Sequence, residues 1–237
     1  MPYFHYDLHL HSCLSPCGDE DMTPANIAGM ASVAGLQIIA LTDHNSTGNC
    51  APLIRAAARF GITALYGMEL TTQEEVHVVC LFESAGAAGQ WQAFVNEKLL
   101  SVQNNPAIFG RQCYMDEFDA VLGEEPNLLI NATAIPFDAV FGPVFELGGV
   151  AFPAHIEKPA NALLANLGFI PPQAGFTVAE LRELSCLEAL KKAHPHLNHC
   201  KILSSSDAHY LQDIGAAGQQ IFLEENSAAC LIHTLRN

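Results

Sequence analysis

The chain has 237 residues, of which 10 are basic and 25 acidic, so its formal charge at pH 7 is −15. Half of the residues are apolar and only 15% are charged, which excludes a disordered chain and allows a sizeable buried core. Ten cations cannot build a broad basic footprint, so we expect no binding of long duplex nucleic acid. A short nucleic-acid end or a small phosphorylated substrate stays open as a partner, and 11 histidines in an acidic chain suit the binding of cations.

The N-terminal residues and the cysteines indicate the cellular compartment in which the protein works. Residues 1–5 show neither the basic start nor the apolar stretch of a secretory signal, and no run approaches the ~18 apolar residues of a membrane span. The eight cysteines of a large, core-rich chain are expected to be reduced thiols rather than a disulfide framework. We therefore expect a cytoplasmic protein with no membrane-spanning segment, and the sequence leaves the oligomeric state open.

The first third of the chain alternates between strand and helix patterns. Residues 3–10 read as a strand, after which Thr23 caps a helix that has Pro24 at its first position and is stopped by Gly35. The following expected elements are a strand at 36–42, a helix at 51–60, strands at 62–66 and 76–82, and a helix at 91–100. Such alternation indicates a parallel sheet with helical crossovers.

The pattern changes at about residue 101 and returns to strands after residue 147. Short helical pieces are expected at 114–122 and 136–146, and we read residues 85–147 as a helical insertion over the sheet of a single domain, 1–237. The later expected elements are strands at 149–153, 177–184, 201–205 and 220–223, and a helix at 227–235. About seven βα units in a chain of this length suit a closed or nearly closed α/β barrel.

Histidines and carboxylates gather at the ends of the expected strands. Asp7, His9 and His11 share one strand face, because side chains two residues apart point the same way. Burial of such polar groups costs free energy unless each has a hydrogen-bond partner or binds a metal ion, and a divalent cation can bind all of them. Similar groups at the other strands are Asp43-His44, Glu69, His77, His155 and Asp207 with His209.

The mixture of carboxylates and imidazoles indicates the kind of metal. It favours Zn²⁺, Mn²⁺ or Fe²⁺ over a purely structural zinc site made of four cysteines, and Mg²⁺ is also compatible. Two or three adjacent ions are needed to use this many ligands. Cys13 and Cys17 lie beside the first cluster, and we interpret them as reduced thiols in a loop.

Taken together, these motifs resemble the PHP (polymerase and histidinol phosphatase) family. The shared features are the Asp-x-His-x-His opening, the Thr-Asp-His after an apolar strand, the Gly-x-Glu, two later histidines and the closing Asp-x-His. The resemblance covers almost the whole chain and is weakest across residues 85–147. It implies an α/β fold, a distorted (β/α)₇ TIM-like barrel, with up to three divalent ions at its C-terminal rim, and a metal-dependent phosphoesterase activity.

The resemblance also implies a set of metal ligands, matched one by one to this sequence. Asp19 is chosen because it stands five residues before Pro24, while Glu20 and Asp21 remain alternatives, since the preceding loop is longer than usual. The implied ligands are His9, His11, Asp19, His44, Glu69 (bridging two ions), His77, His155, Asp207 and His209. Asp7 and Asp43 are expected to orient imidazoles by accepting their other N–H.

The implied mechanism is the attack of a metal-activated hydroxide on phosphorus at a site with two or three ions, which take up the charge of the phosphate oxygens. The candidate catalytic residues are His155, His209 and Asp207, and either histidine could protonate the leaving group. Lys158 and Arg111 are rare cations that could neutralise the substrate phosphate.

Three substrate classes compete within this interpretation: a phosphomonoester metabolite, a nucleotide 3′,5′-bisphosphate and a short oligonucleotide end. One alternative is a non-catalytic, metal-binding regulatory domain. Another is a metallohydrolase of the amidohydrolase type that acts on C–N or C–O bonds. Amidohydrolase barrels often carry a carboxylated Lys on a middle strand, and residues 1–97 contain no Lys. We therefore rank phosphoester hydrolysis first.

Overall fold

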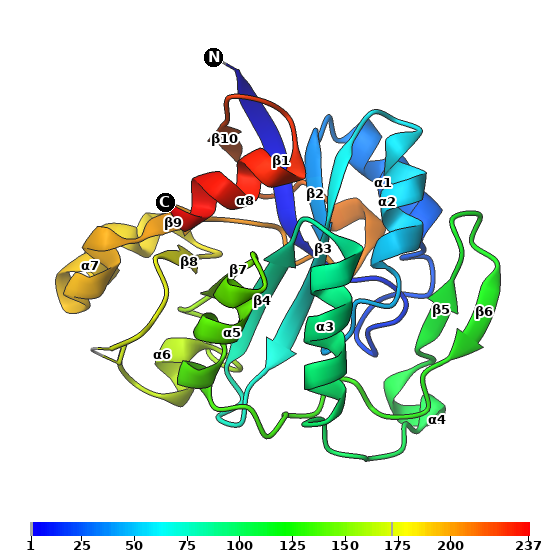
Figure 1. The fold of residues 1–237 in the computed structure, drawn as a ribbon, viewed down its shortest axis with the longest axis horizontal. Helices are drawn as coiled ribbons and strands as arrows, with labels where there is room; N and C mark the ends of the chain where they lie inside the picture. The colour runs from blue at the N-terminus through cyan, green and yellow to red at the C-terminus, as the bar shows by residue number, and fades with distance from the viewer. Residues whose placement is uncertain (1, 172) are drawn as a thin grey trace.

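The computed structural model describes residues 2–171 and 173–237 and has a mixed α/β fold built around a six-stranded sheet (Figure 1). The strand order in this sheet is β10-β1-β2-β3-β4-β7. The strands are β1 (Tyr3–Leu10), β2 (Ile38–Leu41), β3 (Thr63–Thr71), β4 (His77–Phe82), β7 (Val150–Pro153) and β10 (Gln220–Phe222). β1, β2 and β3 are parallel, whereas β4 is antiparallel to both β3 and β7, and β10 is antiparallel to β1.

The sheet is curled into a half-barrel, and a second pair of strands lies across its open side. This pair is β8 (Val178–Glu180) and β9 (Lys201–Leu203), which are parallel. The amide of Ile156, just after β7, donates to the carbonyl of Glu180 at 3.0 Å, and the amide of His11 donates to the carbonyl of Ala208 at 3.0 Å. The first bond joins β8 to the segment after the edge strand β7, and the second joins the segment after β9 to the end of β1, the strand next to the other edge strand, β10.

The parallel sheet expected from the sequence does not continue through β4. β3 and β4 run antiparallel, with Thr71 paired to His77, so the chain reverses in a short turn and no helix crosses between them. Residues 3–33 follow the expectation closely. Thr23 accepts a hydrogen bond from the amide of Asn26 at the start of α1 (Pro24–Val33), and Gly35 has a φ of 72° just beyond it.

Helices cover both faces of the sheet. α1 and α2 (Cys50–Ala58) pack against β1 and β2 around Leu10 and Leu41, and α8 (Ala228–Arg236) packs on a cluster that contains Leu8. A third cluster joins α3 (Ala85–Asn96) and α5 (Phe141–Glu146) to β4, with the buried Trp91 among its members. Three apolar clusters therefore hold the sheet rigidly from both sides.

The insertion is not all helical, and the helix expected at 114–122 is wrong. This part of the chain forms a hairpin of β5 (Cys113–Met115) and β6 (Val121–Glu124), next to the short helix α4 (Pro106–Phe109). The reason is local: Asp116 Oδ1 accepts from the amides of Phe118 and Ala120, each at 2.8 Å. An Asp side chain that binds backbone amides in this way favours a turn over a helix.

The second half of the chain contains mostly short elements. The strand expected at 177–184 is limited to β8 and gives way to short helices. The remaining helices are η1 (Phe137–Ala139), α6 (Leu163–Asn166), η2 (Leu184–Cys186), α7 (Leu187–Ala193), η3 (Pro195–His199) and η4 (Leu211–Asp213). Among the residues described, no helix has the length and apolar character needed to cross a membrane.

Candidate metal centre

One edge of the sheet brings together most of the ligand-type residues expected from the sequence. The parallel strands β1, β2 and β3 end at this edge, which places His9, His44 and Glu69 there. β4 runs the opposite way, so its first residue, His77, lies at the same edge. His155 follows β7. Strand direction alone therefore explains why residues from distant parts of the chain meet.

Glu69 lies at the centre of this group. Its side chain is 1% exposed. Five imidazole nitrogens surround its two oxygens: those of His9, His77 and His155 lie 3.2, 2.8 and 3.1 Å from Oε1, and those of His11 and His44 lie 3.3 and 3.1 Å from Oε2. Burial opposes ionisation of this carboxyl, but the surrounding imidazoles outweigh it and hold its pKa well below the usual range.

The nitrogens that face Glu69 are the best test of whether the site fits metal ions. The following atoms are buried and have no hydrogen-bond partner among the described residues: His9 Nε2, His11 Nε2, His44 Nδ1 and His77 Nδ1. Two ligand atoms on one tetrahedral ion, at bonds of roughly 2.0–2.1 Å, lie roughly 3.3–3.4 Å apart. The spacings around Glu69 are close to this value, so the residues fit divalent ions well.

The ligand-type atoms of the centre fall into overlapping sets. Four sets of ligand atoms lie within 4.8 Å of one another: His9, His11 and Glu69; His9, His155 and Asp207; His44, Glu69 and His77; and His11, Cys17, His44 and His209. Because His9, His11, His44 and Glu69 each belong to two sets, neighbouring ions would share ligands. This sharing is consistent with the adjacent ions expected from the sequence.

Asp207, His209 and Lys158 form the more open side of the centre. Asp207 Oδ1 lies 3.4 Å from the Nε2 atoms of both His9 and His11, and Oδ2 accepts a hydrogen bond from Lys158 Nζ at 2.7 Å. His209 Nδ1 is 2.8 Å from the Asp207 carbonyl, which can only accept, so Nδ1 carries the proton and Nε2 keeps a lone pair. Burial lowers the pKa of His209 to about 4, so the ring is neutral at pH 7.

Glu180, at the end of β8, is a functional residue that the sequence analysis missed. It is 2% exposed, its Oε2 lies 2.8 Å from His9 Nδ1, and it accepts a 3.2 Å hydrogen bond from the amide of His155. A carboxylate on Nδ1 fixes the imidazole tautomer and directs Nε2 towards Glu69. The only signal in the sequence is an acidic residue inside an apolar run, the same signal that marks Glu69.

Asp43 does not contact an imidazole directly, contrary to expectation. Its carboxylate accepts from the amide and hydroxyl of Ser12 at 2.7 and 2.6 Å and from the hydroxyl of Ser15 at 2.7 Å. Ser15 Oγ in turn lies 3.0 Å from His11 Nδ1. Asp43 therefore positions His11 through Ser15.

Asp7 also acts on the backbone rather than on an imidazole, which corrects the second expectation of this kind. It accepts from the amides of Ser206 and Gly215 at 3.0 and 2.9 Å. These bonds hold both ends of the loop that carries Asp207. Burial raises the pKa of Asp7 to about 6.

The loop after β1 supplies a different ligand-type residue from the one expected. Asp19, Glu20 and Asp21 belong to none of the four sets, and the Asp19 carboxylate instead accepts from the amide of Asp21 at 3.0 Å. Cys17, interpreted from the sequence as a loop thiol, lies within the set that contains His209. Its thiol pKa is raised by burial, and a bound metal ion would favour the thiolate.

Of the two cations expected to contact the phosphate, only Lys158 lies at the centre. Arg111 pairs with Glu124 of the hairpin at 2.6 Å, and it lines a separate cavity together with Cys13 and Glu20. The hairpin therefore holds Arg111 away from the group of residues around Glu69.

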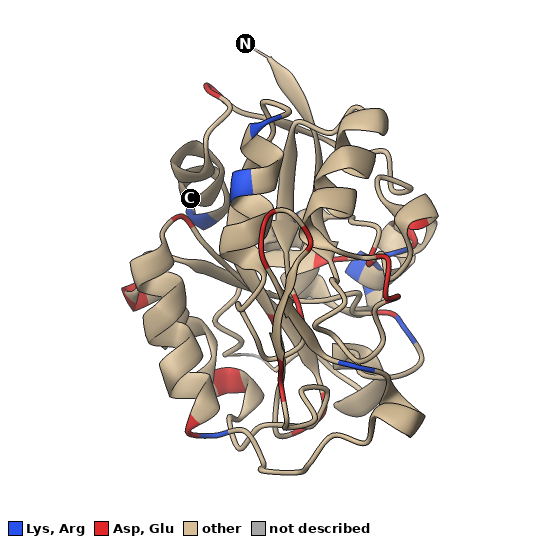
Figure 2. Ribbon diagram, turned by 90° about the vertical axis from the view of Figure 1, so that its right-hand side faces the viewer, with Lys and Arg blue, Asp and Glu red and all other residues tan. Residues whose placement is uncertain are grey.

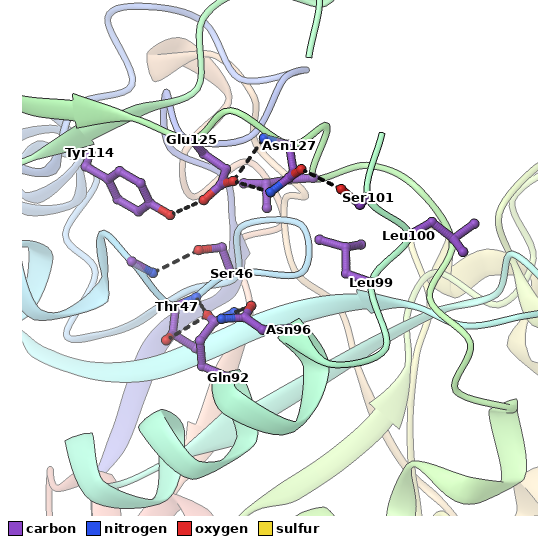
Figure 3. A pocket seen from close by; sticks show the side chains of 12 residues that line it. Ser46, Thr47, Gln92, Asn96, Leu99, Leu100, Ser101, Tyr114, Glu125 and Asn127 are labelled. Atoms are coloured by element: carbon purple, nitrogen blue, oxygen red, sulfur yellow. Dashed lines mark hydrogen bonds between the residues drawn. The ribbon is translucent and has the colours of Figure 1, made fainter. Parts of the chain in front are cut away.

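A cavity of about 410 Å³ adjoins the loop that follows His44 (Figure 3). Gln92 of α3 connects this cavity to the loop: its Oε1 accepts from the amide of Thr47 at 2.6 Å, and its Nε2 donates to the carbonyl of Asn45 at 3.1 Å. In Figure 3 the Tyr114 hydroxyl points to Glu125, at 2.7 Å. The two bonds of Gln92 tie the insertion to the loop that carries His44, and the Tyr114–Glu125 bond lies within the insertion.

The sequence of this chain matches a known protein family. The model of the PHP domain matches residues 7–144, which is more than half of the chain. A 3′,5′-nucleoside bisphosphate phosphatase from Chromobacterium violaceum is 40% identical over 90 residues, which are 35% of this chain and 30% of that protein. The match thus spans less than a third of the length of that curated relative.

Solved structures of low sequence identity share the fold. A lesion-specific endonuclease from Pyrococcus furiosus has a TM-score of 0.71 at 16% identity over 99% of this chain and 56% of its own. An amidohydrolase from Chromobacterium violaceum, solved with bound sulfate and no metal, has a TM-score of 0.60 at 22% identity over 94% of this chain and 93% of its own. With the family model matching the segment that carries His9, His44 and Glu69, the chain belongs to the PHP domain family.

Proposed function

We propose that the protein is a metal-dependent phosphoesterase that hydrolyses a phosphomonoester or the terminal phosphate of a nucleotide or short oligonucleotide. The observation that carries the proposal is the convergence of five buried imidazole nitrogens on the carboxylate of Glu69. Membership of the PHP family and the partial match to a nucleoside bisphosphate phosphatase support it.

Two or three ions are proposed at this centre, as Zn²⁺, Mn²⁺ or Fe²⁺, with Mg²⁺ also compatible. When bound, the ions would lower the pKa of a water molecule and place positive charge against the phosphate oxygens. The proposed ligands are His9, His11, His44, Glu69, His77, His155, Asp207 and His209, with Cys17 as the ligand from the loop after β1.

The remaining residues hold or move protons and charge. Lys158, which is 31% exposed and 2.7 Å from Asp207, would contact the substrate phosphate when the ions take over the charge of Asp207. His209 is 25% exposed whereas His155 is 3% exposed, so a substrate can approach His209 more easily. Because the Nδ1 proton of the neutral His209 ring is bonded to the Asp207 carbonyl, its proposed part is to bind an ion through Nε2.

A small phosphorylated substrate fits the charge of the chain better than a long polymer. Figure 2 shows basic residues as separate short segments among acidic ones over the described part of the chain on that side. With 10 basic against 25 acidic residues, a long duplex would meet more repulsion than attraction. The endonuclease of similar fold is nearly twice as long as the part that aligns with this chain. We therefore propose that the largest substrates are short nucleic-acid ends and not duplexes.

Two further proposals concern the chain as a whole. We propose that residues 1–237 form one PHP-type barrel domain, closed by the β8–β9 pair and interrupted by the insertion at 85–147. We also propose that it works in a reducing, cytoplasmic environment, which the eight free cysteines support.

The experiment is a measurement of phosphate release from phosphomonoesters, nucleotides and short oligonucleotides. Metal-stripped protein is refilled with Mn²⁺, Zn²⁺ or Fe²⁺ and compared with His9→Ala and Asp207→Ala. Turnover that depends on metal and is lost in both variants would establish the activity and rank its substrates. Metal binding without turnover on any member would contradict the proposal and favour a regulatory metal-binding domain.

A further inference from the structure

One set of possible ligand atoms at the metal centre differs in its chemistry from the other three. Its members are His11, Cys17, His44 and His209. Their ligand atoms all lie within 4.8 Å of one another. Each of the other three sets in the described part of the chain contains Glu69 or Asp207, whereas this one contains a thiol and no carboxylate. Thiolate and imidazole ligands suit Zn²⁺, while carboxylates suit Mn²⁺ and Mg²⁺.

Two imidazoles of this nitrogen–sulfur set already have one ring nitrogen held by the protein. The Ser15 hydroxyl donates to Asp43 at 2.7 Å, so it accepts from His11 Nδ1 at 3.0 Å. His11 Nε2 is buried and has no hydrogen-bond partner among the described residues. His209 Nδ1 donates to the carbonyl of Asp207 at 2.8 Å, which leaves the lone pair on Nε2. Histidines that ligate metal ions are oriented in the same way.

The loop that carries Cys17 is held against the segment that carries His209. The amide of Asp19 donates to the carbonyl of His209 at 2.9 Å. Gly18, between Cys17 and Asp19, makes a close approach possible, because a Cβ at this position would collide with the carbonyl oxygen of Ser12. Backbone contacts of the two residues that follow Cys17 therefore bring its thiol to the imidazoles.

The nitrogen–sulfur set does not compete for ligands with every carboxylate-bearing set. It shares no residue with the set of His9, His155 and Asp207, so an ion in one would take no side chain from the other. Cys17, Asp207 and His209 also contribute to the lining of a cavity of about 370 Å³, which provides an entry path for ions. Two ions with different ligands would therefore not exclude each other from the centre.

We propose that the nitrogen–sulfur set is a site that selects Zn²⁺, while the carboxylate-bearing sets of the same centre take an ion that prefers oxygen, such as Mn²⁺ or Mg²⁺. The inference rests on the proposed metal-dependent function and specifies which ion each part of the centre takes. When Zn²⁺ binds, the S–H bond of Cys17 is broken and its proton is released to solvent, so that the ligand is a thiolate. Cys17 selects the ion and takes no part in the attack on phosphorus.

The test uses Co²⁺, which substitutes for Zn²⁺ and gives a sulfur-to-metal charge-transfer absorption in the near ultraviolet when a thiolate is bound. Metal-stripped wild-type protein titrated with Co²⁺ should develop this band. An equimolar amount of Zn²⁺ should then remove the band, whereas an excess of Mn²⁺ should not. The band reports the sulfur ligand directly and does not depend on any measurement of activity.

Two variants of Cys17 separate the sulfur from the site as a whole. Cys17→Ser should lack the band and bind Zn²⁺ at least about 100-fold more weakly, since even the loss of an outer partner of a ligating histidine costs up to about this factor. Its affinity for Mn²⁺ should change by less than about threefold. Cys17→Asp should bind Co²⁺ without the band and shift the preference of the site from Zn²⁺ towards Mn²⁺.

Cys13→Ser is the matched control, because Cys13 lies in the same loop but is buried with Cys113 and Met115 of the hairpin. It should keep the band and both affinities. Binding of Co²⁺ by the wild-type protein without the band would overturn the nitrogen–sulfur site, and so would a band that persists in Cys17→Ser. Wild-type protein that binds neither Co²⁺ nor Mn²⁺ would instead overturn the metal centre and with it the proposed function. Unchanged melting temperatures of the metal-free variants exclude misfolding as the cause of a loss.

Discussion

The polar side chains at the metal centre and those that hold its loops differ in their hydrogen bonding. His9, His11 and His44 each leave a ring nitrogen without a partner among the described residues. In Asp43 and Gln92, in contrast, the polar side-chain atoms form hydrogen bonds with backbone or hydroxyl groups of the protein. Buried polar groups without partners are costly. The difference therefore separates a group of atoms that needs an external cation from a scaffold that is already complete.

The largest expected effect comes from Glu69, the residue that five imidazoles share. Glu69→Gln keeps the shape but removes the charge that would bridge neighbouring ions, so we expect a loss of at least about 1,000-fold in kcat/KM, because metal and oriented ligands act as a unit. Metal content by elemental analysis should fall with the activity. Glu97→Gln, an exposed residue of the same type, is the control. Full metal content in Glu69→Gln would show that the unpaired nitrogens bind ions without this carboxylate.

A second expectation concerns pH. Burial lowers the pKa of His11, but the carboxylates of Asp207 and Glu69 outweigh it and raise the value to about 9. Metal-free protein therefore holds a proton on His11 at pH 7, and an ion must displace it. Apparent metal affinity should rise by up to about tenfold per unit between pH 7 and 9 and level off above that. Calorimetric titration in buffers of different ionisation enthalpy would count the released protons, and a flat affinity over this range would contradict the assignment.

Glu180 lies on the border between the two regions, because it is scaffold to His9 yet contacts the metal ligands. Glu180→Gln should weaken metal binding by about 10–100-fold, as is typical when the partner of a ligating histidine is altered. The protein should remain folded, since the amide can still accept from the His155 backbone. A titration with Mn²⁺ followed by its magnetic resonance signal gives the affinity. Glu188→Gln, 90% exposed at its side chain, should leave the affinity unchanged.

The smallest effect is expected in the scaffold. Gln92→Ala removes the hydrogen bonds to Thr47 and Asn45 and should lower the free energy of unfolding by about 1–3 kcal/mol. Activity should fall only a few-fold, through the looser position of His44. Gln90→Ala on the same helix, where the side chain makes one long exposed bond to Gly86, is the control. A loss of activity as large as that of Glu69→Gln would erase the distinction between scaffold and centre.

The sequence predicts the part of the centre that depends on strand periodicity. Residues 3–10 alternate between apolar core and polar edge, and the expected ligands His9, His44 and Glu69 all fall where a strand meets the rim. Because these signals are local, the sequence was sufficient to find them. The PHP resemblance, now supported by the family match over residues 7–144, rests on the same positions.

The sequence does not predict contacts that depend on distant pairing. Glu180 lies 171 residues from His9 in the chain, and nothing near it indicates an imidazole partner. Cys17, and not Asp19, lies within a set of possible ligand atoms because of the way the loop folds back, which the periodicity of the sequence does not indicate. The hairpin in the insertion was missed because the side-chain hydrogen bonds of Asp116 override an ambiguous helical pattern.

The most direct test of the account is an X-ray experiment on crystals grown with Mn²⁺, with anomalous data collected at the manganese edge. We expect at least two peaks, each about 2.0–2.3 Å from an oxygen of Glu69 or Asp207 and from imidazole nitrogens that now lack partners. Glu180 and Asp43 should carry no peak of their own. An anomalous map without density between Glu69 and its five imidazoles, in crystals that contain Mn²⁺, would contradict the central claim that these atoms are arranged for metal ions.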